Sequence, residues 1–196
     1  MNQDKFSEVL SKIDALNAQD PNQDMSGGKD WPRELLYSQR LTDWVLKLSP
    51  NASEELRIAA RGQHVCRWKV PREQYEMNRQ GYLRWREGLK KFHAETVAGL
   101  MKHAGYEEAN IQRVKTLILK KDLKNDAETQ TLEDGLCLVF LETQFADLIA
   151  KTPADKMAVI VQKTWQKMSA AGKAAALTLA MGQAEKDMLV KSGILS

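Results

Sequence analysis

The sequence predicts an all-α protein. Long stretches repeat apolar residues every three to four positions, which is the spacing of one face of a helix. Only five of the 196 residues are proline, and 43% are hydrophobic. That composition suffices for one sizeable core, so we expect a single helical bundle over residues 1–196. Residues 152–196 are expected to form a carboxy-terminal helical extension packed on it.

In the amino-terminal half, the first helix is expected over residues 4–18, with Phe6, Leu10, Ile13 and Leu16 facing inward. Residues 19–30 are expected to form a polar loop with Pro21 and the Gly27-Gly28 pair. Pro32 stands near the start of the next helix, a favoured place for proline, and Ser49-Pro50-Asn51 ends that helix. Ser53 is the expected N-cap of a third helix, which bears His64.

The second half continues the same pattern. Residues 68–80 lack a clean period and are expected to be an ordered loop, followed by a long helix over 82–104 that stops at Gly105. Further helices are expected over 107–120, 129–149, 153–169 and 173–191, with a basic turn at 120–126. The small residues of 170–176 suggest close packing of helices or of a partner subunit, so a homodimer is one expectation.

Charge and cysteine content narrow the function classes. The net charge of +3 is too small to indicate nucleic-acid binding by itself. Cys66 and Cys137 form no CxxC motif, which favours a reduced protein. Met1–Leu10 lacks a basic region followed by an apolar run, and the longest apolar run, Leu136–Leu141, is far shorter than the roughly 20 residues of a membrane span. We therefore expect a cytoplasmic protein with no membrane contact.

Three polar residues stand on apolar helix faces. His64 follows Leu56 and Ala60 at helical spacing, His93 lies between Leu89 and Val97, and Asp134 precedes Cys137 and Leu138. A buried carboxylate needs a partner, because an unpaired charge in an apolar interior is very costly. The set is compatible with a metal site, with a hydrogen-bonded cluster that only positions helices, or with a ligand site without metal.

At these residues the chain resembles the HD-domain superfamily of all-helical, metal-dependent phosphohydrolases. That family presents a histidine on one helix, a His-Asp pair on a later helix, and a further aspartate beyond it. His64, His93 and Asp134 follow this order, and Leu132 to Leu138 resembles the last aspartate motif. The resemblance implies that these three residues hold one divalent metal ion of unknown identity, and that Glu133 acts as general base or orients a water.

The chain also resembles a small family of bacterial and fungal proteins described as a domain of unknown function. The similar segments are Gln63 to Trp68, Trp85-Arg86, Lys91 to Ala94, and Leu132 to Glu142. This similarity covers roughly residues 4–151. It indicates family membership and implies no particular activity.

Two positions depart from the HD pattern. Ala94 replaces the aspartate that follows the second histidine, which leaves at most three protein ligands from the motif. Glu133 or Glu95 could substitute, but Glu133 and Asp134 are adjacent and point about 100° apart on a helix. Lys120 stands where some HD proteins place another histidine. A lysine there would repel a second cation and favour a phosphate or carboxylate.

A basic and aromatic stretch surrounds the histidines. Arg67 and Arg72 flank the segment after His64, and arginine binds phosphate with two parallel hydrogen bonds. With Lys120 and Lys124 they are the expected phosphate contacts, and Trp68 offers an aromatic face for stacking. The alternative is an exposed basic face with Trp68 and Trp85 in the core. The functional interpretation is a small anionic or nucleotide ligand.

Two function hypotheses follow. The first is an enzyme, a metal-dependent phosphohydrolase acting on a small phosphorylated molecule or nucleotide. The second is a catalytically degenerate module that keeps the anion pocket, lacks metal, and binds an anionic ligand or a partner protein. Ala94 and Lys120 are the features that favour the second hypothesis. Metal content and the effect of His64→Ala or Asp134→Ala distinguish them.

Overall fold

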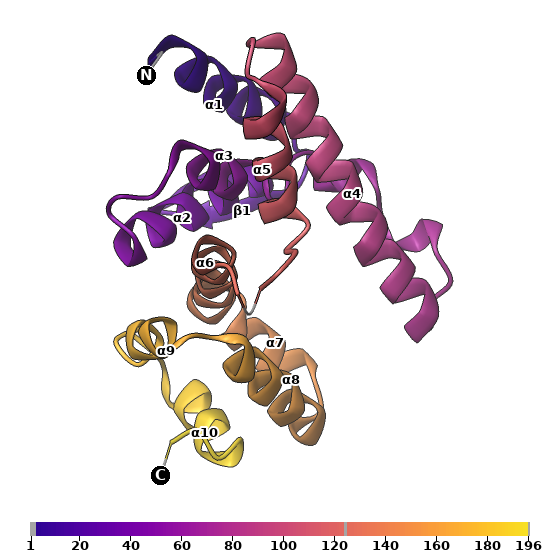
Figure 1. Cartoon of the computed structure of the whole chain (residues 1–196). Coiled ribbons are helices and arrows are strands. Elements are labelled where there is room, and N and C mark those ends of the chain that lie inside the picture. The colour runs from indigo at the N-terminus through magenta and orange to yellow at the C-terminus, as the bar shows by residue number, and fades with distance from the viewer. Residues whose placement is uncertain (1–2, 124, 196) are drawn as a thin grey trace.

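The computed structural model describes residues 3–123 and 125–195, and it confirms the all-α prediction (Figure 1). The helices of the described chain are α1 Gln3–Asn17, α2 Arg33–Leu48, α3 Glu54–Gly62, α4 Arg79–His103, α5 Glu108–Ile118, α6 Ala127–Thr143, α7 Phe145–Lys151, α8 Ala154–Lys167, α9 Ala170–Ala176 and α10 Gln183–Lys191. None of these described helices is long and apolar enough to cross a membrane.

The helix ends follow local side-chain chemistry. Ser53 accepts a hydrogen bond from the amide of Leu56 at 3.0 Å and begins α3, as predicted. Asp126 caps α6 in the same way through the amide of Thr129. Gly105 ends α4 with a left-handed φ of 76°, which glycine adopts without steric cost.

Helix α6 occupies the middle of the molecule. Figure 1 shows it between a group formed by α1 to α5 and a group formed by α7 to α10. Its side chains are buried on several sides, including Leu132, Leu138 and Val139, each fully buried. Removing one such side chain from water contributes about 2 kcal/mol. Buried residues from Phe6 to Leu189 form one cluster, so side chains of α8, α9 and α10 belong to the same core as those of the earlier helices.

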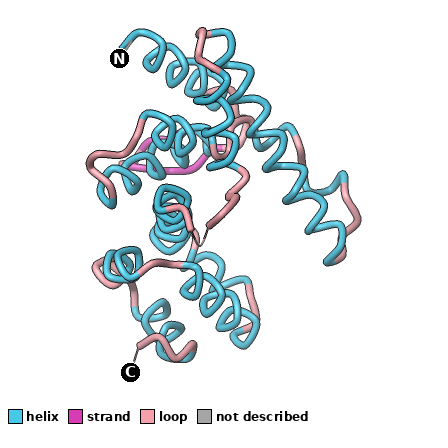
Figure 2. The backbone as a smooth tube through the Cα atoms, viewed as in Figure 1, coloured by secondary structure: helices cyan, strands magenta, loops and turns pink. Residues whose placement is uncertain are grey.

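The expected loop at residues 19–30 contains a small hairpin instead. Strand β1 (Gln23–Ser26) pairs antiparallel with β2 (Lys29–Pro32), and Figure 2 shows both strands in magenta. Gly27 and Gly28 both have positive φ, the requirement of a tight two-residue turn that matches strand twist. Buried Asp20 fixes the hairpin to α2 by accepting from the amides of Asn22 and Glu34.

Three other expectations need correction. The helix expected over 129–149 breaks at Gln144, which leaves helical geometry and allows Phe145 to become fully buried. The helix expected over 173–191 is divided into α9 and α10, and the second begins where the amide of Gly182 donates to Glu185. The loop 68–80 contains two short 3₁₀ turns, and α4 begins at Arg79, earlier than expected.

Candidate anion-binding site

Two histidines from distant parts of the chain meet beyond the end of α3. His64 does not lie on α3 as expected. It stands in the following turn, where Cys66 adopts a left-handed φ of 54° and its amide donates to Asn17 Oδ1. His93 lies on the buried face of α4. The two ring centroids are 5.9 Å apart, so the fold brings these two predicted residues together.

His93 is held in one tautomer by the backbone. Its Nδ1 lies 2.8 Å from the carbonyl oxygen of Val65, which can only accept, so Nδ1 carries the proton and Nε2 is bare. Burial lowers the pKa of His93 to about 3, and the imidazole is neutral at pH 7. Nε2 is buried and has no hydrogen-bond partner among the described residues. Such an acceptor requires an explanation, and a ligand is one.

His64 is fixed from its other side by α2. Its ring stacks on Tyr37 with centroids 4.3 Å apart and an angle of 18° between planes. Burial, reinforced by the charge of Arg67, lowers the pKa of His64 well below its usual value. The ring is therefore neutral and retains one N–H donor. Its Nδ1 lies 3.5 Å from Glu34 Oε2.

Glu34 is the functional candidate that the sequence analysis missed. It stands in the first turn of α2 and is 6% exposed, and its Oε2 has no hydrogen-bond partner in the described chain. Burial raises the pKa of this carboxyl to about 7, although Arg67 acts in the opposite direction. The signal was present: Glu34, Ser38 and Leu41 are spaced along one helix face, the same rule that singled out His64.

A cavity of about 270 Å³ opens in front of these groups, and we call it the phosphate cavity. It combines three guanidinium groups with one imidazole and one buried carboxyl. The lining residues are Asp24, Arg33, Glu34, Tyr37, Arg40, His64, Arg67, Thr143 and Gln144. Its three arginines outnumber its two carboxyl groups, Asp24 and Glu34, so its chemistry suits an anion.

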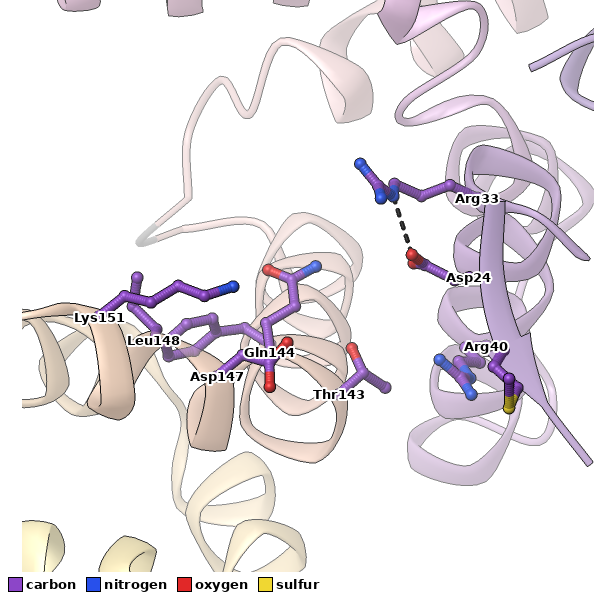
Figure 3. Close-up of a pocket in the computed structure, with 10 residues that line it drawn as sticks. Asp24, Arg33, Arg40, Thr143, Gln144, Asp147, Leu148 and Lys151 are labelled. Carbon is purple, nitrogen blue, oxygen red and sulfur yellow. Dashed lines mark hydrogen bonds and ion pairs between the residues drawn. The ribbon is translucent and has the colours of Figure 1, made fainter. Parts of the chain in front are cut away.

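A second cavity of about 480 Å³ continues from the first, between the hairpin and the α6–α7 break. We call it the hairpin cleft. Figure 3 shows Asp24, Arg33 and Arg40 on one side of it, with Gln144 and Lys151 on the other. Arg33 Nε donates to Asp24 Oδ1 at 3.0 Å on the hairpin side. Two of the features that differ from the sequence prediction, the hairpin and the α6–α7 break, therefore lie on opposite sides of this cleft.

The other predicted ligand contacts are dispersed. Trp68 lines a third cavity with Trp85 and Arg67, which we call the tryptophan cavity. Arg72 donates to the carbonyl oxygens of Tyr75, Glu76 and Asn78, and so it holds the loop before α4 together. It lines none of the cavities described above. Lys124 lies outside the described residues.

Lys120 and Glu133 form a buried pair behind the histidines. Lys120 Nζ lies 2.6 Å from Glu133 Oε2, and Lys167 Nζ lies 3.5 Å from Glu133 Oε1. Burial alone would raise the pKa of Glu133, but the two ammonium groups outweigh it and lower that pKa. Lys120 also lines a space of about 70 Å³ with both histidines. Glu133, the expected general base, thus forms ion pairs with two lysines.

Lys120 has a left-handed φ of 55° at the end of α5, a position where glycine is usual. Non-glycine residues in this region persist where the surrounding structure holds them, and they cluster at functional sites. Cys66, beside His64, shares this conformation. Two left-handed residues therefore flank the histidine pair.

Asp134 does not join the histidines. Its Oδ1 accepts from the amide of Ser169 at 2.8 Å and from Gln130, and its Oδ2 accepts from the hydroxyl of Ser169. It faces α9 because adjacent helix positions point about 100° apart. In the described part of the chain, no three histidine, cysteine, aspartate or glutamate side chains are grouped to hold a metal ion. The residues present thus do not fit the expected set of three metal ligands.

Fold and site together define a class: an all-helical protein with a neutral histidine pair behind a cavity rich in arginine. A family model described as a domain of unknown function, DUF4202, matches residues 7–189. The chain belongs to this family, and the resemblance to a domain of unknown function is thereby confirmed. No curated protein and no solved structure matches the chain.

Proposed function

We propose that this protein binds a phosphate ester, or a closely similar small anion, in the phosphate cavity without a bound metal ion. The observation that carries the proposal is the convergence of Arg33, Arg40 and Arg67 with His64 on one cavity. Guanidinium groups bind phosphate with two parallel charge-assisted hydrogen bonds, and each such bond is about twice as strong as a neutral one.

Arg67 is the central contact of this proposal. Among the described residues its guanidinium has no hydrogen-bond partner, and its nearest carboxylate oxygen, Glu34 Oε1, is 3.8 Å from Nε. The group rests over the ring of Trp85, with 4.9 Å from guanidinium carbon to ring centroid. This stacking orients the guanidinium while its N–H donors stay available for a ligand.

Glu34 and His64 supply the remaining polar groups. A neutral imidazole donates one hydrogen bond to a phosphate oxygen, and a protonated Glu34 carboxyl donates another. With a pKa of about 7, Glu34 is protonated in a large fraction of molecules at neutral pH. Asp24, the other carboxyl group of the lining, is already paired with Arg33. A protonated Glu34 therefore lowers the negative charge that an anion meets in the cavity.

Titration calorimetry with inorganic phosphate and phenyl phosphate tests the proposal. We expect Arg67→Ala to weaken binding at least tenfold and Arg84→Ala, which removes an exposed arginine of α4 outside the cavity, to change nothing. Equal affinity in folded Arg67→Ala and wild type would overturn the proposal. The proposal would also be overturned if neither inorganic phosphate nor phenyl phosphate bound to the wild type.

A second candidate is the metal-dependent phosphohydrolase of the HD type, acting on a small phosphorylated molecule or nucleotide. The bare Nε2 of His93 favours it, because metal-binding histidines commonly donate their other ring N–H to a backbone carbonyl. Elemental mass spectrometry on wild type, His93→Ala and Asp134→Ala tests it. Stoichiometric metal that is absent from His93→Ala would support this candidate, and metal-free wild type after reconstitution would exclude it.

A further inference from the structure

We infer that the hairpin cleft holds the organic part of the ligand, and that this part is a sugar or another polyol. The inference rests on the proposed function, since it takes the phosphate group to lie in the phosphate cavity. It narrows the ligand from any phosphate ester to a phosphorylated polyhydroxy compound.

The two cavities are continuous. Both are lined by Asp24, Arg33, Arg40, Thr143 and Gln144. A phosphate in contact with Arg33 and Arg40 therefore adjoins the hairpin cleft, and we place its ester oxygen on that side. The cleft volume of about 480 Å³ lies in the range of small-molecule sites, roughly 300–1,000 Å³.

The polar side chains on the α6–α7 side of the cleft are exposed, and their hydrogen-bonding capacity is open to a ligand. Among the described residues, no hydrogen bond or ion pair involves the side chain of Gln144, Asp147 or Lys151, although all three line the cleft. A carboxylate accepts, an ammonium donates, and an amide does both. A hydroxyl group both donates and accepts, so a polyol satisfies all three, and a purely apolar group satisfies none.

The cleft also has apolar lining. Phe140 and Leu148 contribute to it, and both are half-buried. A sugar presents C–H groups on its ring faces and hydroxyls at its edges, which matches this combination of apolar and polar lining. The mixture of polar side chains and apolar surface thus favours a sugar over a long aliphatic chain.

A planar base would be expected in the tryptophan cavity, where stacking surfaces gather. There, however, Arg67 already covers a face of Trp85, and Trp85 Nε1 donates to the carbonyl oxygen of Val70 at 2.8 Å. This cavity shares Arg33, Glu34 and Arg67 with the phosphate cavity but not Arg40. The observations therefore favour the hairpin cleft for the organic group.

Calorimetry at pH 7 with inorganic phosphate, ribose 5-phosphate, glucose 6-phosphate and adenosine monophosphate tests the inference. We expect one of the two sugar phosphates to bind at least tenfold more tightly than inorganic phosphate. The double variant Asp147→Ala/Lys151→Ala should remove most of that gain and leave the affinity for inorganic phosphate unchanged. Asp155→Ala/Lys156→Ala changes the same residue types on the exposed face of α8 and should keep the gain.

The outcomes separate this inference from the proposed function. If no probe binds, the proposed function fails. If inorganic phosphate binds but neither sugar phosphate gains affinity, or the gain survives in Asp147→Ala/Lys151→Ala, the inference alone is overturned. It is also overturned if adenosine monophosphate binds tenfold more tightly than ribose 5-phosphate and Trp68→Ala abolishes that difference.

Discussion

Asp134 receives two hydrogen bonds from Ser169, one from its amide at 2.8 Å and one from its hydroxyl. Ser169 in turn caps α9 by accepting from the amide of Gly172. The carboxylate that resembles a metal ligand in sequence thus connects α6 to the start of α9. This relationship links the middle of the molecule to its carboxy-terminal helices.

The first prediction concerns the energy of this link. Asp134→Ala should lower the free energy of unfolding by about 2 kcal/mol, because hydrogen bonds to a charged group contribute about 1.5–3 kcal/mol. Ser169→Ala should cost less, and the double variant should cost less than the two single losses together. Urea unfolding of the four proteins measures the coupling. Strictly additive losses would show that the two side chains do not interact.

Gly172 offers an independent test of the same contact. A Cβ at this position would lie 2.6 Å from Asp134 Cγ. Asp134 cannot move away without losing its hydrogen bonds to Ser169. Gly172→Ala should therefore destabilise the protein by about 1–3 kcal/mol through overpacking. Gly99→Ala is the control, since that site in α4 is open, and there alanine should stabilise by about 0.5–1 kcal/mol. Thermal unfolding measures both changes in stability relative to wild type. The prediction is contradicted if both variants are destabilised or both are stabilised.

The buried pair of Lys120 and Glu133 should be more costly to break than to replace. Lys120→Met leaves Glu133 facing only the more distant Lys167 and should destabilise by about 3 kcal/mol. Lys120→Met/Glu133→Leu removes both charges and should recover most of that loss. Chemical denaturation of both variants decides this. A double variant less stable than Lys120→Met would show that the pair itself is needed for the fold.

Acid stability should depend on Asp126. Arg113 donates to both of its oxygens and lowers the pKa of Asp126 to about 2, aided by the amide of Thr129. A carboxyl with a lowered pKa stabilises the fold above its unfolded pKa, and that contribution is lost as pH falls from about 4 to about 2. Asp126→Asn keeps the capping ability and loses the charge.

Wild type should therefore exceed Asp126→Asn in unfolding free energy by about 1 kcal/mol at pH 6, a value reduced for partial solvent screening. The two proteins should converge near pH 2. Urea titrations at both pH values provide the measurement. The contributions of the other acidic groups are the same in both proteins, so they cancel when the two unfolding free energies are subtracted. A gap that stays constant with pH would refute the assignment.

Much of the helical scaffold could be predicted from the sequence, because helix formation is largely local. The Ser53 cap and the stop at Gly105 depend on neighbours within one or two turns. The break at Gln144 could not be predicted in this way, since it accompanies the full burial of Phe145, which is a feature of the tertiary structure. The hairpin was missed although Gly27-Gly28 is a recognised turn signal.

The site was predictable only in part. Apolar spacing indicated that His93 and Asp134 are buried, and both are. Spacing cannot show which partner a buried group meets, and Asp134 meets Ser169 while Glu133 meets Lys120. Glu34 carried the same spacing signal, but at a helix start a glutamate is also explained by the helix dipole.

The last prediction follows from the position of Glu34 on the phosphate cavity. Its pKa of about 7 lies above that of an ordinary glutamate, because burial disfavours the charged form. At pH 8 the carboxylate is mostly ionised and repels an anion beside Arg67. Glu34→Gln should therefore tighten anion binding severalfold at pH 8. At pH 6 wild type is mostly protonated, and the gain should nearly vanish.

Sulfate is the suitable probe, because its charge stays constant between these two pH values while that of phosphate changes. Calorimetric titrations of wild type and Glu34→Gln at both pH values give four affinities to compare. Glu95→Gln, which neutralises an exposed glutamate of α4, should match wild type throughout. If Glu34→Gln binds sulfate no better than wild type at pH 8, Glu34 does not face the bound anion, and the cavity is occupied differently from our proposal.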